Sequence, residues 1–258
     1  MIQVVAGQAT ATLKPLFDLG APTGIRCFAV LNGGNAGRIL TDDPEHPQWA
    51  YVWEADDGTL YRGGRQDAGV LGQVVHGLRQ ESLIALGYRD GDPGVSLFPP
   101  NPNACAACLE FRRPMGSSDL TAYLGPLGCG YEIYRMDRQL LESSPHYEGT
   151  LRRYGSVEAC LEHGIAVCLL HGKDTVCEAY ADMDVLGVRE LGVTTQKPYR
   201  GRGFATVTCA HLLTMCEEQN SQAYWDCARL NTASARLARK LGFRYEREYR
   251  LLAWFPEG

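Results

Sequence analysis

Long apolar runs and concentrated basic charge are both missing from this chain of 258 residues. No stretch approaches the ~18 apolar residues that a membrane-spanning helix needs, and Met1 to Lys14 lacks the basic start and apolar centre of a secretion signal. Lysine and arginine number 25 against 30 acidic residues, so the net charge is −5. The sequence predicts a cytoplasmic protein that acts on small molecules, with neither nucleic acid nor membrane as partner.

Two common nucleotide-binding loops are also absent. A Walker loop ends in Gly-Lys-Ser/Thr, whereas the single Gly-Lys pair, Gly172-Lys173, is followed by Asp174. A dinucleotide fingerprint needs a third small residue at its sixth position, where the best match has Thr206. Neither a P-loop nucleotide nor a dinucleotide is therefore expected.

Cysteine is abundant, with ten residues, yet its placement favours core packing. Cys209 and Cys216 fall on one stripe of a predicted helix, where a buried thiol behaves as a small apolar side chain. Cys105 and Cys108 form a Cys-x-x-Cys pair that suits a zinc knuckle or a redox pair, but no second pair follows at the usual spacing. We expect reduced thiols and no metal, with a metal at Cys105 and Cys108 as the open alternative.

The informative feature that is present is a strand, a glycine loop and a helix in immediate succession. Arg189 to Thr195 has the composition of a strand, Arg200 to Ala205 reads Arg-Gly-Arg-Gly-Phe-Ala, and Phe204 to Cys216 has a helical pattern. Gly201 and Gly203 let the backbone approach a ligand closely, and the N–H groups of a helix start attract an anion. This order predicts a phosphate-binding loop.

Two motifs extend this prediction. Arg200, Gly203 and Ala205 fit the pattern Arg/Gln-x-x-Gly-x-Gly/Ala, and Asn231 to Phe243 begins Asn-Thr-Ala-Ser and ends Lys-Leu-Gly-Phe. In this order they resemble the two signatures of the GNAT acyltransferase superfamily. The Glu-Leu-Gly-Val-Thr-Thr run ending at Thr195 makes the chain most similar to the two-part subfamily associated with zwittermicin-type antibiotic resistance.

The resemblance implies a GNAT fold of the α/β (α+β) class, a mixed central sheet flanked by helices, over residues 119–258. The Pro-rich segment from Phe98 to Asn103 separates it from a first half that carries no chemical motif. Residues 1–118 are expected to form a smaller mixed α/β domain that contributes to the acceptor cleft or is a degenerate GNAT-like copy. In this half we predict strands at Ile25–Leu31 and Trp49–Trp53 and an amphipathic helix over Asp67–Leu86.

In the second half the predicted elements follow the order of the GNAT fold. A helical region is expected from Asp137 to His163 with a break at Pro145, and a further helix from Asn231 to a left-handed Gly242. The predicted strands are Gly130–Met136, Gly164–His171, Thr175–Ala181, Arg189–Thr195, Ala223–Cys227 and Arg244–Trp254.

The resemblance also implies the acyl donor, acetyl-coenzyme A or another acyl-coenzyme A. The backbone of Val193, Thr194 and Thr195 would pair with the pantetheine arm by strand addition. The N–H groups of the loop from Arg200 to Ala205 would hold the pyrophosphate, with Arg200 and Arg202 adding charge. Asn231 and Ser234 are expected near the pantetheine, with a purely helix-capping role as the alternative.

The acyl acceptor implied is the amine of a small molecule, for instance an antibiotic or a natural-product intermediate. Glu190 is the candidate base, acting through water, unless it is a salt-bridged acid at the end of a strand. Ala238 stands where many members have the tyrosine that protonates the thiolate, so Tyr224 becomes the candidate acid, ahead of Cys227 or water. Because Ala238 replaces this tyrosine, a non-catalytic coenzyme A-binding or regulatory module is the alternative function. The sequence also leaves open whether the chain forms a homodimer.

Overall fold

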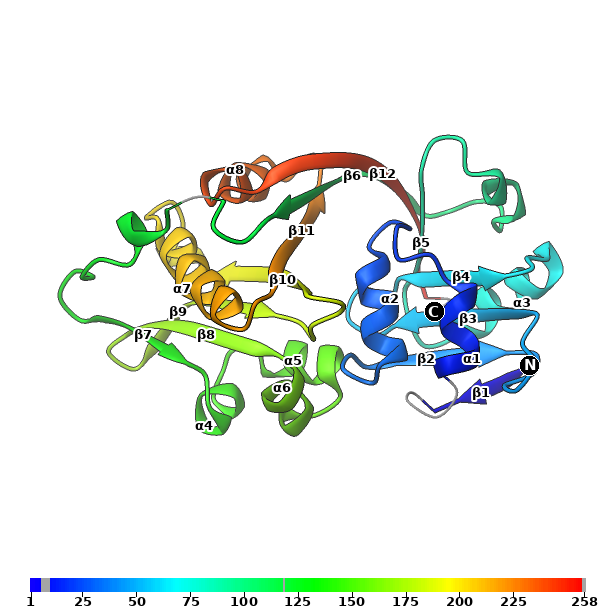
Figure 1. Cartoon of the computed structure of the whole chain (residues 1–258), viewed down its shortest axis with the longest axis horizontal. Helices are drawn as coiled ribbons and strands as arrows, with labels where there is room; N and C mark the ends of the chain where they lie inside the picture. Colours follow the sequence, from blue (N-terminus) through cyan, green and yellow to red (C-terminus); the bar gives the residue numbers. More distant parts are fainter. Residues whose placement is uncertain (6–9, 118, 257–258) are drawn as a thin grey trace. The chain divides into compact units, whose positions relative to one another are not determined.

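A computed structural model describes residues 1–5, 10–117 and 119–256, and the chain divides into two compact units (Figure 1). Unit 1 contains Met1–Leu109, Ala228–Leu230 and Glu248–Gly258, and unit 2 contains Glu110–Cys227 and Asn231–Arg247. The division predicted from sequence falls at Ser118, which lies outside the described residues, and it stays a prediction.

Both helices and strands occur in each unit of the described chain. The α-helices are α1 Thr10–Leu13, α2 Gly24–Leu31, α3 Ala68–Arg79, α4 Arg138–Glu142, α5 Tyr147–Tyr154, α6 Val157–His163, α7 Phe204–Glu218 and α8 Thr232–Lys240. Short 3-10 helices cover Lys14–Leu16, Pro93–Leu97, Thr121–Tyr123 and Lys197–Tyr199. The strands are β1 Ile2–Val4, β2 Gly37–Thr41, β3 Trp49–Glu54, β4 Leu60–Gly64, β5 Ile84–Tyr88, β6 Ala104–Arg113, β7 Tyr131–Arg135, β8 Ile165–His171, β9 Asp174–Ala181, β10 Val188–Thr195, β11 Gln222–Ala228 and β12 Arg244–Trp254.

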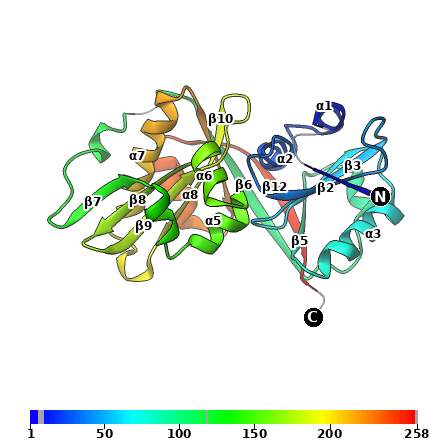
Figure 2. The same cartoon turned by 90° about the horizontal axis from the view of Figure 1, so that it is seen from below.

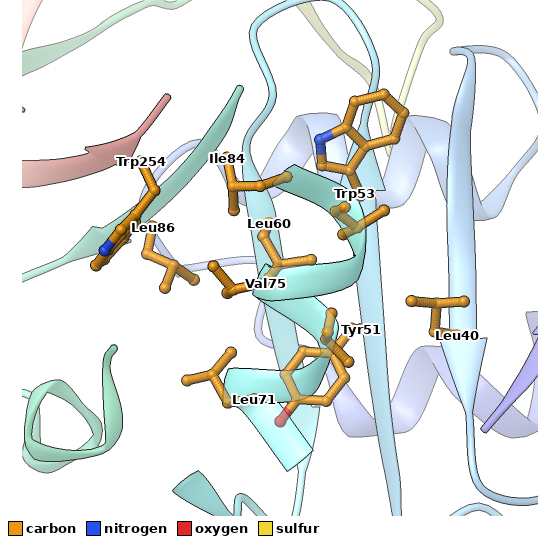
Figure 3. Packing of buried hydrophobic residues seen from close by; sticks show 11 residues of the cluster. Leu40, Tyr51, Trp53, Leu60, Leu71, Val75, Ile84, Leu86 and Trp254 are labelled. Atoms are coloured by element: carbon orange, nitrogen blue, oxygen red, sulfur yellow. The ribbon is translucent and has the colours of Figure 1, made fainter. Parts of the chain in front are cut away.

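Unit 1 is built on an antiparallel sheet with the strand order β1-β2-β3-β4. Helix α2 contributes Cys27, Val30 and Leu31 to one apolar core with β2 and β3. Helix α3 contributes to a second core, which Figure 3 shows from close by. The buried members of this second core are Leu40, Tyr51, Trp53, Leu60, Leu71, Val74, Val75, Leu78, Ile84, Leu86 and Trp254.

Two sequence predictions for unit 1 are wrong. The predicted strand Ile25–Leu31 is helix α2, because a short run that is apolar throughout carries no period that separates a buried helix from a strand. The predicted helix Asp67–Leu86 ends at Arg79, and its last apolar positions belong to β5. Its start is right, since the Asp67 carboxylate caps α3 by accepting from the N–H groups of Gly69 and Val70.

The second sheet has the strand order β5-β12-β6-β11-β10-β9-β8-β7, and both β6 and β12 contain residues of both units. In unit 1, β5 pairs antiparallel with the end of β12, from Arg250 to Trp254. In unit 2, β7 to β10 form an antiparallel meander, and β11 runs parallel to β10. The strands predicted at Gly130–Met136, Gly164–His171, Thr175–Ala181, Arg189–Thr195 and Ala223–Cys227 are therefore confirmed.

Helices cover both faces of the strands of unit 2 (Figure 2). Cys168 of β8 packs in a core with α4, α5 and α6, whereas its neighbour Leu169 packs in another core with Phe204 of α7. Successive residues of a strand point to opposite faces, so the two sets of helices lie on opposite sides of the sheet. The predicted helical region broken at Pro145 is broken a second time after α5, where Gly155 adopts a φ of 81°.

Candidate active site

Strands β10 and β11 pair over a short distance and then part. The parallel register covers three pairs, Val188–Gln222, Arg189–Ala223 and Glu190–Tyr224. Both strands continue, β10 to Thr195 and β11 to Ala228, and β10 stays paired with β9 to its end. Within the described part of the chain, β10 thus has an edge without a strand partner beyond Glu190.

The main-chain groups on that edge follow from the pairing with β9. Two bonds of 2.9 Å fix the pattern, from the Asp182 N–H to the Glu190 carbonyl and from the Gln196 N–H to the Val176 carbonyl. Because N–H and C=O groups alternate between the two edges of a strand, those of Val193 and Thr195 point away from β9. Thr194 points toward β9, so of the three predicted pantetheine contacts only Val193 and Thr195 offer main-chain groups to the open edge.

The glycine loop lies between β10 and α7. Gly201 and Gly203 have φ values of 76° and 84°, a left-handed conformation that glycine adopts without steric cost. A Cβ at either position would meet no atom within 4 Å, so the space beside the loop is open. The N-cap of α7 is Gly203, which has no side chain to bond the first N–H groups, and the described residues show no side-chain cap there. The start of α7, at Phe204 and Ala205, can therefore bind an anion.

The two arginines of the loop differ in what they contact. The Arg200 Nε donates to the carbonyl of Thr195 (3.0 Å), which holds the loop against the end of β10. The Arg202 guanidinium donates to the Tyr131 hydroxyl (3.1 Å) and lies 5.0 Å from the centre of the Phe204 ring. Arg202 therefore has a fixed position on an aromatic surface beside the loop, with its positive charge close to the start of α7.

Glu190 and Tyr224 form the last pair before β10 and β11 part, and both are buried, with exposed fractions of 5% and 3%. The Tyr224 hydroxyl donates to Oε1 of Glu110 over 2.6 Å, and the other oxygen of Glu110 lies 3.2 Å from the Arg247 Nε. Glu110, which is 1% exposed, was not identified from sequence. The two predicted catalytic residues are thus brought together, with a second acidic side chain, that of Glu110, bonded to Tyr224.

The surroundings of Tyr224 keep its proton in place. Burial raises the pKa of Tyr224 well above its usual value, and the negative charges of Asp226, Glu110 and Glu190 raise it further. Because its hydroxyl proton is directed at the Glu110 carboxylate, the geometry favours an anchoring role over the proton-donor role predicted for it. The role of Tyr224 as a proton donor stays a prediction.

Replacing Tyr224 with phenylalanine is expected to lower the free energy of unfolding by about 1–2 kcal/mol, since Glu110 is buried and loses a hydrogen-bond donor. Urea unfolding of both proteins measures the difference. The exposed tyrosine of β7, Tyr134, provides a control, because its hydroxyl bonds the surface residue Glu132 and its loss should change stability little. Equal stability of Tyr224→Phe and the wild type would contradict an anchoring role.

The second motif forms the predicted capped helix. The Asn231 side chain accepts from the Ser234 N–H (3.1 Å) at the start of α8, and the Ser234 hydroxyl accepts from the indole N–H of Trp225 (2.9 Å). Gly242 follows α8 with a φ of 86°, which confirms the predicted left-handed end. Ala238 lies fully buried on this helix. Alanine has no hydroxyl, so this position cannot supply the proton that a tyrosine supplies in many GNAT enzymes.

The described residues were also compared with the requirements of a metal site and of a membrane-spanning helix. Among residues 1–5, 10–117 and 119–256, no three His, Cys, Asp or Glu side chains form a group that could hold a metal ion. Cys105 is exposed and Cys108 is buried, and both lie on β6. None of the helices described is long and apolar enough to cross a membrane.

Comparison with known proteins places these motifs in a wider group. Residues 105–252 match the model of the GNAT acetyltransferase family. The uncharacterized N-acetyltransferase YdfB of Bacillus subtilis (strain 168) is 27% identical over an alignment of 258 positions, which covers 96% of this chain and 97% of that protein. The match therefore spans both units.

Solved structures confirm the predicted fold. A GCN5-related N-acetyltransferase-like protein from Streptococcus suis 89/1591 has a TM-score of 0.73 at 22% identity, covering 96% of this chain and 98% of its own. A tandem GNAT protein from the clavulanic acid biosynthesis pathway has a TM-score of 0.66 at 10% identity, covering 100% of this chain and 98% of its own.

Proposed function

Because the chain belongs to the GNAT acetyltransferase family, we propose that it is an acyl-coenzyme A-dependent N-acyltransferase that transfers an acetyl group to the amine of a small molecule. The observation that carries the proposal is the open edge of β10 beside an uncapped helix start. This arrangement offers main-chain groups for a pantetheine arm and N–H donors for a pyrophosphate on neighbouring segments of one unit.

The residues present fit acetyl-coenzyme A as the co-substrate. Gly201 and Gly203 leave open the space that a Cβ would otherwise occupy, so phosphate oxygens can reach the N–H groups from Gly203 to Ala205. Arg202 adds positive charge beside them. The main-chain groups of Val193 and Thr195 would bind the amides of the pantetheine arm, with Asn231 and Ser234 of α8 as further candidates.

The chemistry needs a proton acceptor for the amine and a donor for the carbonyl oxygen. Glu190 lies at the residue where the strands part, so its carboxylate is placed to take a proton from the amine through water. The amine nitrogen then attacks the thioester carbonyl carbon. The Val193 N–H points toward the open edge, where it would stabilise the negative charge that develops on the carbonyl oxygen.

We also propose that the N-terminal half of the chain is a degenerate copy of the GNAT fold. The similarity of the whole chain to a tandem GNAT protein supports this reading. An acceptor drawn from antibiotics or their biosynthetic intermediates is supported by the resemblance to the zwittermicin-resistance subfamily. A role for residues 1–118 in acceptor binding stays a prediction.

Acetyl-coenzyme A is expected to stabilise the protein against unfolding by about 2.7 kcal/mol at a concentration one hundredfold above its Kd. Thermal unfolding with and without millimolar acetyl-coenzyme A measures this shift. In Gly203→Val the shift should be lost, because a branched side chain is strained at a φ of 84° and fills the open space beside the loop.

The matched control is Gly172→Val. Gly172 has a φ of 61° and an open Cβ direction in the β8–β9 turn, so this variant carries similar strain but should keep the shift. Absence of a shift in the wild-type protein with acetyl-, propionyl- and malonyl-coenzyme A would refute the function. If acyl-coenzyme A shifts thermal unfolding but no amine of a panel leads to release of coenzyme A thiol, the result would support the alternative function, a non-catalytic regulatory module. The alanine at position 238 favours this alternative.

A further inference from the structure

The proposed reaction leaves one proton unassigned, and the following inference rests on that function. When the C–S bond breaks, its electron pair stays on sulfur, and the thiolate needs a proton. Ala238 has no group to supply one, and the Tyr224 proton is held by Glu110. A donor must therefore reach the open edge of β10 from another element.

The Tyr180 side chain of β9 reaches over the neighbouring strand β10. It pairs with Gly192, and the three atoms nearest to a Cβ built on Gly192 are Cζ, the hydroxyl oxygen and Cε2 of Tyr180. Any side chain at position 192 would overlap the phenol, so the glycine allows the hydroxyl end of the ring to lie directly over β10. Gly192 is two residues beyond Glu190 and thus shares its face of the strand.

The ring is held in this position from the helix side. The guanidinium carbon of Arg153 on α5 lies 3.6 Å from the centre of the Tyr180 ring. Arg153 also donates to Oδ1 of Asp182 (3.2 Å), which receives the Tyr154 hydroxyl at the same distance. A positive charge packed on the ring stabilises the negative charge that the phenol oxygen gains when its proton leaves.

We propose that Tyr180 is the proton donor for the departing coenzyme A thiolate. The amine nitrogen forms the new C–N bond, the C–S bond breaks, and the Tyr180 hydroxyl proton moves to sulfur. The proton lost by the amine passes through water to Glu190. Solvent then returns a proton to the Tyr180 oxygen and removes one from Glu190, so the net products are an amide and coenzyme A.

The test is Tyr180→Phe, assayed by thiol release from acetyl-coenzyme A with the best acceptor from a panel of spermidine, tyramine, lysine methyl ester and kanamycin. A fall in kcat of about 100-fold is expected, the lower end of the range for general acid catalysis, because a thiolate leaves readily. The Kd of acetyl-coenzyme A should not change, which also shows that the variant is folded. Tyr134→Phe removes an exposed tyrosine hydroxyl from β7, outside this cluster, and should keep kcat.

A second readout does not depend on turnover. The pH at which bound coenzyme A thiol ionises, followed by thiolate absorbance, should be higher in Tyr180→Phe, because a hydrogen-bond donor to the thiolate is lost. Gly192→Ala, which displaces the phenol, should raise it as well. Wild-type kcat and an unchanged thiol titration in Tyr180→Phe would overturn the proposal while the proposed function stands. A wild type that neither binds acetyl-coenzyme A nor releases thiol would overturn both.

Discussion

Replacing Glu190 with glutamine is expected to lower kcat by about 10²- to 10⁴-fold, the range for loss of a general base. Glutamine keeps the size of the side chain and its hydrogen-bonding capacity but cannot take a proton from the amine. Since Glu190 is buried at the last β10–β11 pair, no bulk water replaces it directly. Thiol release under saturating acetyl-coenzyme A, with the best amine of the panel, measures the change.

A second acidic residue provides the control for this variant. Glu178 is also buried, lies on the neighbouring strand β9 and accepts a hydrogen bond from the Ser144 hydroxyl (2.7 Å). Burial raises the pKa of Glu178. Glutamine keeps the size of this side chain and an acceptor for the Ser144 hydroxyl, so the variant should leave kcat within a few-fold of wild type. If Glu190→Gln keeps wild-type kcat, or the two variants lose activity equally, Glu190 is not the base.

The pH profile separates the two roles that the sequence left open for Glu190. As a base it must be ionised to act, so kcat/KM of the wild type falls toward acid pH, and this limb should be absent from the residual activity of Glu190→Gln. As a strand-end acid in a salt bridge it would affect stability and leave the shape of the profile unchanged. Profiles of both proteins with the same amine decide between the roles.

Local sequence signals predicted the parts of the site that local physics controls. A few adjacent residues decide where a glycine takes a positive φ, where a helix is capped and where a strand precedes a loop. The structure confirms the left-handed Gly242, the Asn231 cap and the strand that ends at Thr195. The resemblance supplied their order and hence the fold. The direction of each main-chain group on β10 needed the register with β9, which adjacent residues do not reveal.

Residues whose role depends on a partner on another strand were not predicted from the sequence. Glu110 lies 114 positions from Tyr224 in sequence, and the strand that carries it was not predicted at all. An isolated glutamate between Leu109 and Phe111 was the only available signal. Tyr180 was missed for a similar reason, since its importance follows from the glycine opposite it on another strand. Burial and cross-strand partners, which the sequence does not show, decide both cases.

Replacing Arg113 with methionine is expected to destabilise the protein by about 3 kcal/mol, the lower end of the range for breaking a buried ion pair. Arg113 is 1% exposed on β6. It pairs with Glu217 of α7, and its Nε donates to the carbonyl of Leu241 at the end of α8 (2.8 Å). One side chain thus connects a strand and two helices of unit 2, and methionine fills its volume without replacing either bond.

The loss should depend on pH, with a sign that follows from Glu217. Partial burial alone raises the pKa of Glu217, but the Arg113 hydrogen bond, the Gly116 N–H and the Arg113 charge together lower it below its usual 4.5. A lowered pKa contributes stability above the unfolded value that is lost as the pH falls through the folded value. The difference between wild type and Arg113→Met should therefore be largest near neutral pH and shrink below about pH 4.

Arg112 is the matched control for this prediction. It is the preceding residue of β6, is 33% exposed, and pairs with Glu246 over 3.2 Å on the surface. Arg112→Met should cost less than about 1 kcal/mol, because solvent screens an exposed pair and its side chains lose entropy on pairing. Urea unfolding at neutral pH and near pH 4 measures both variants. Equal losses in the two variants, or a loss in Arg113→Met that does not change with pH, would show that burial and the Glu217 pair do not determine the stability of unit 2.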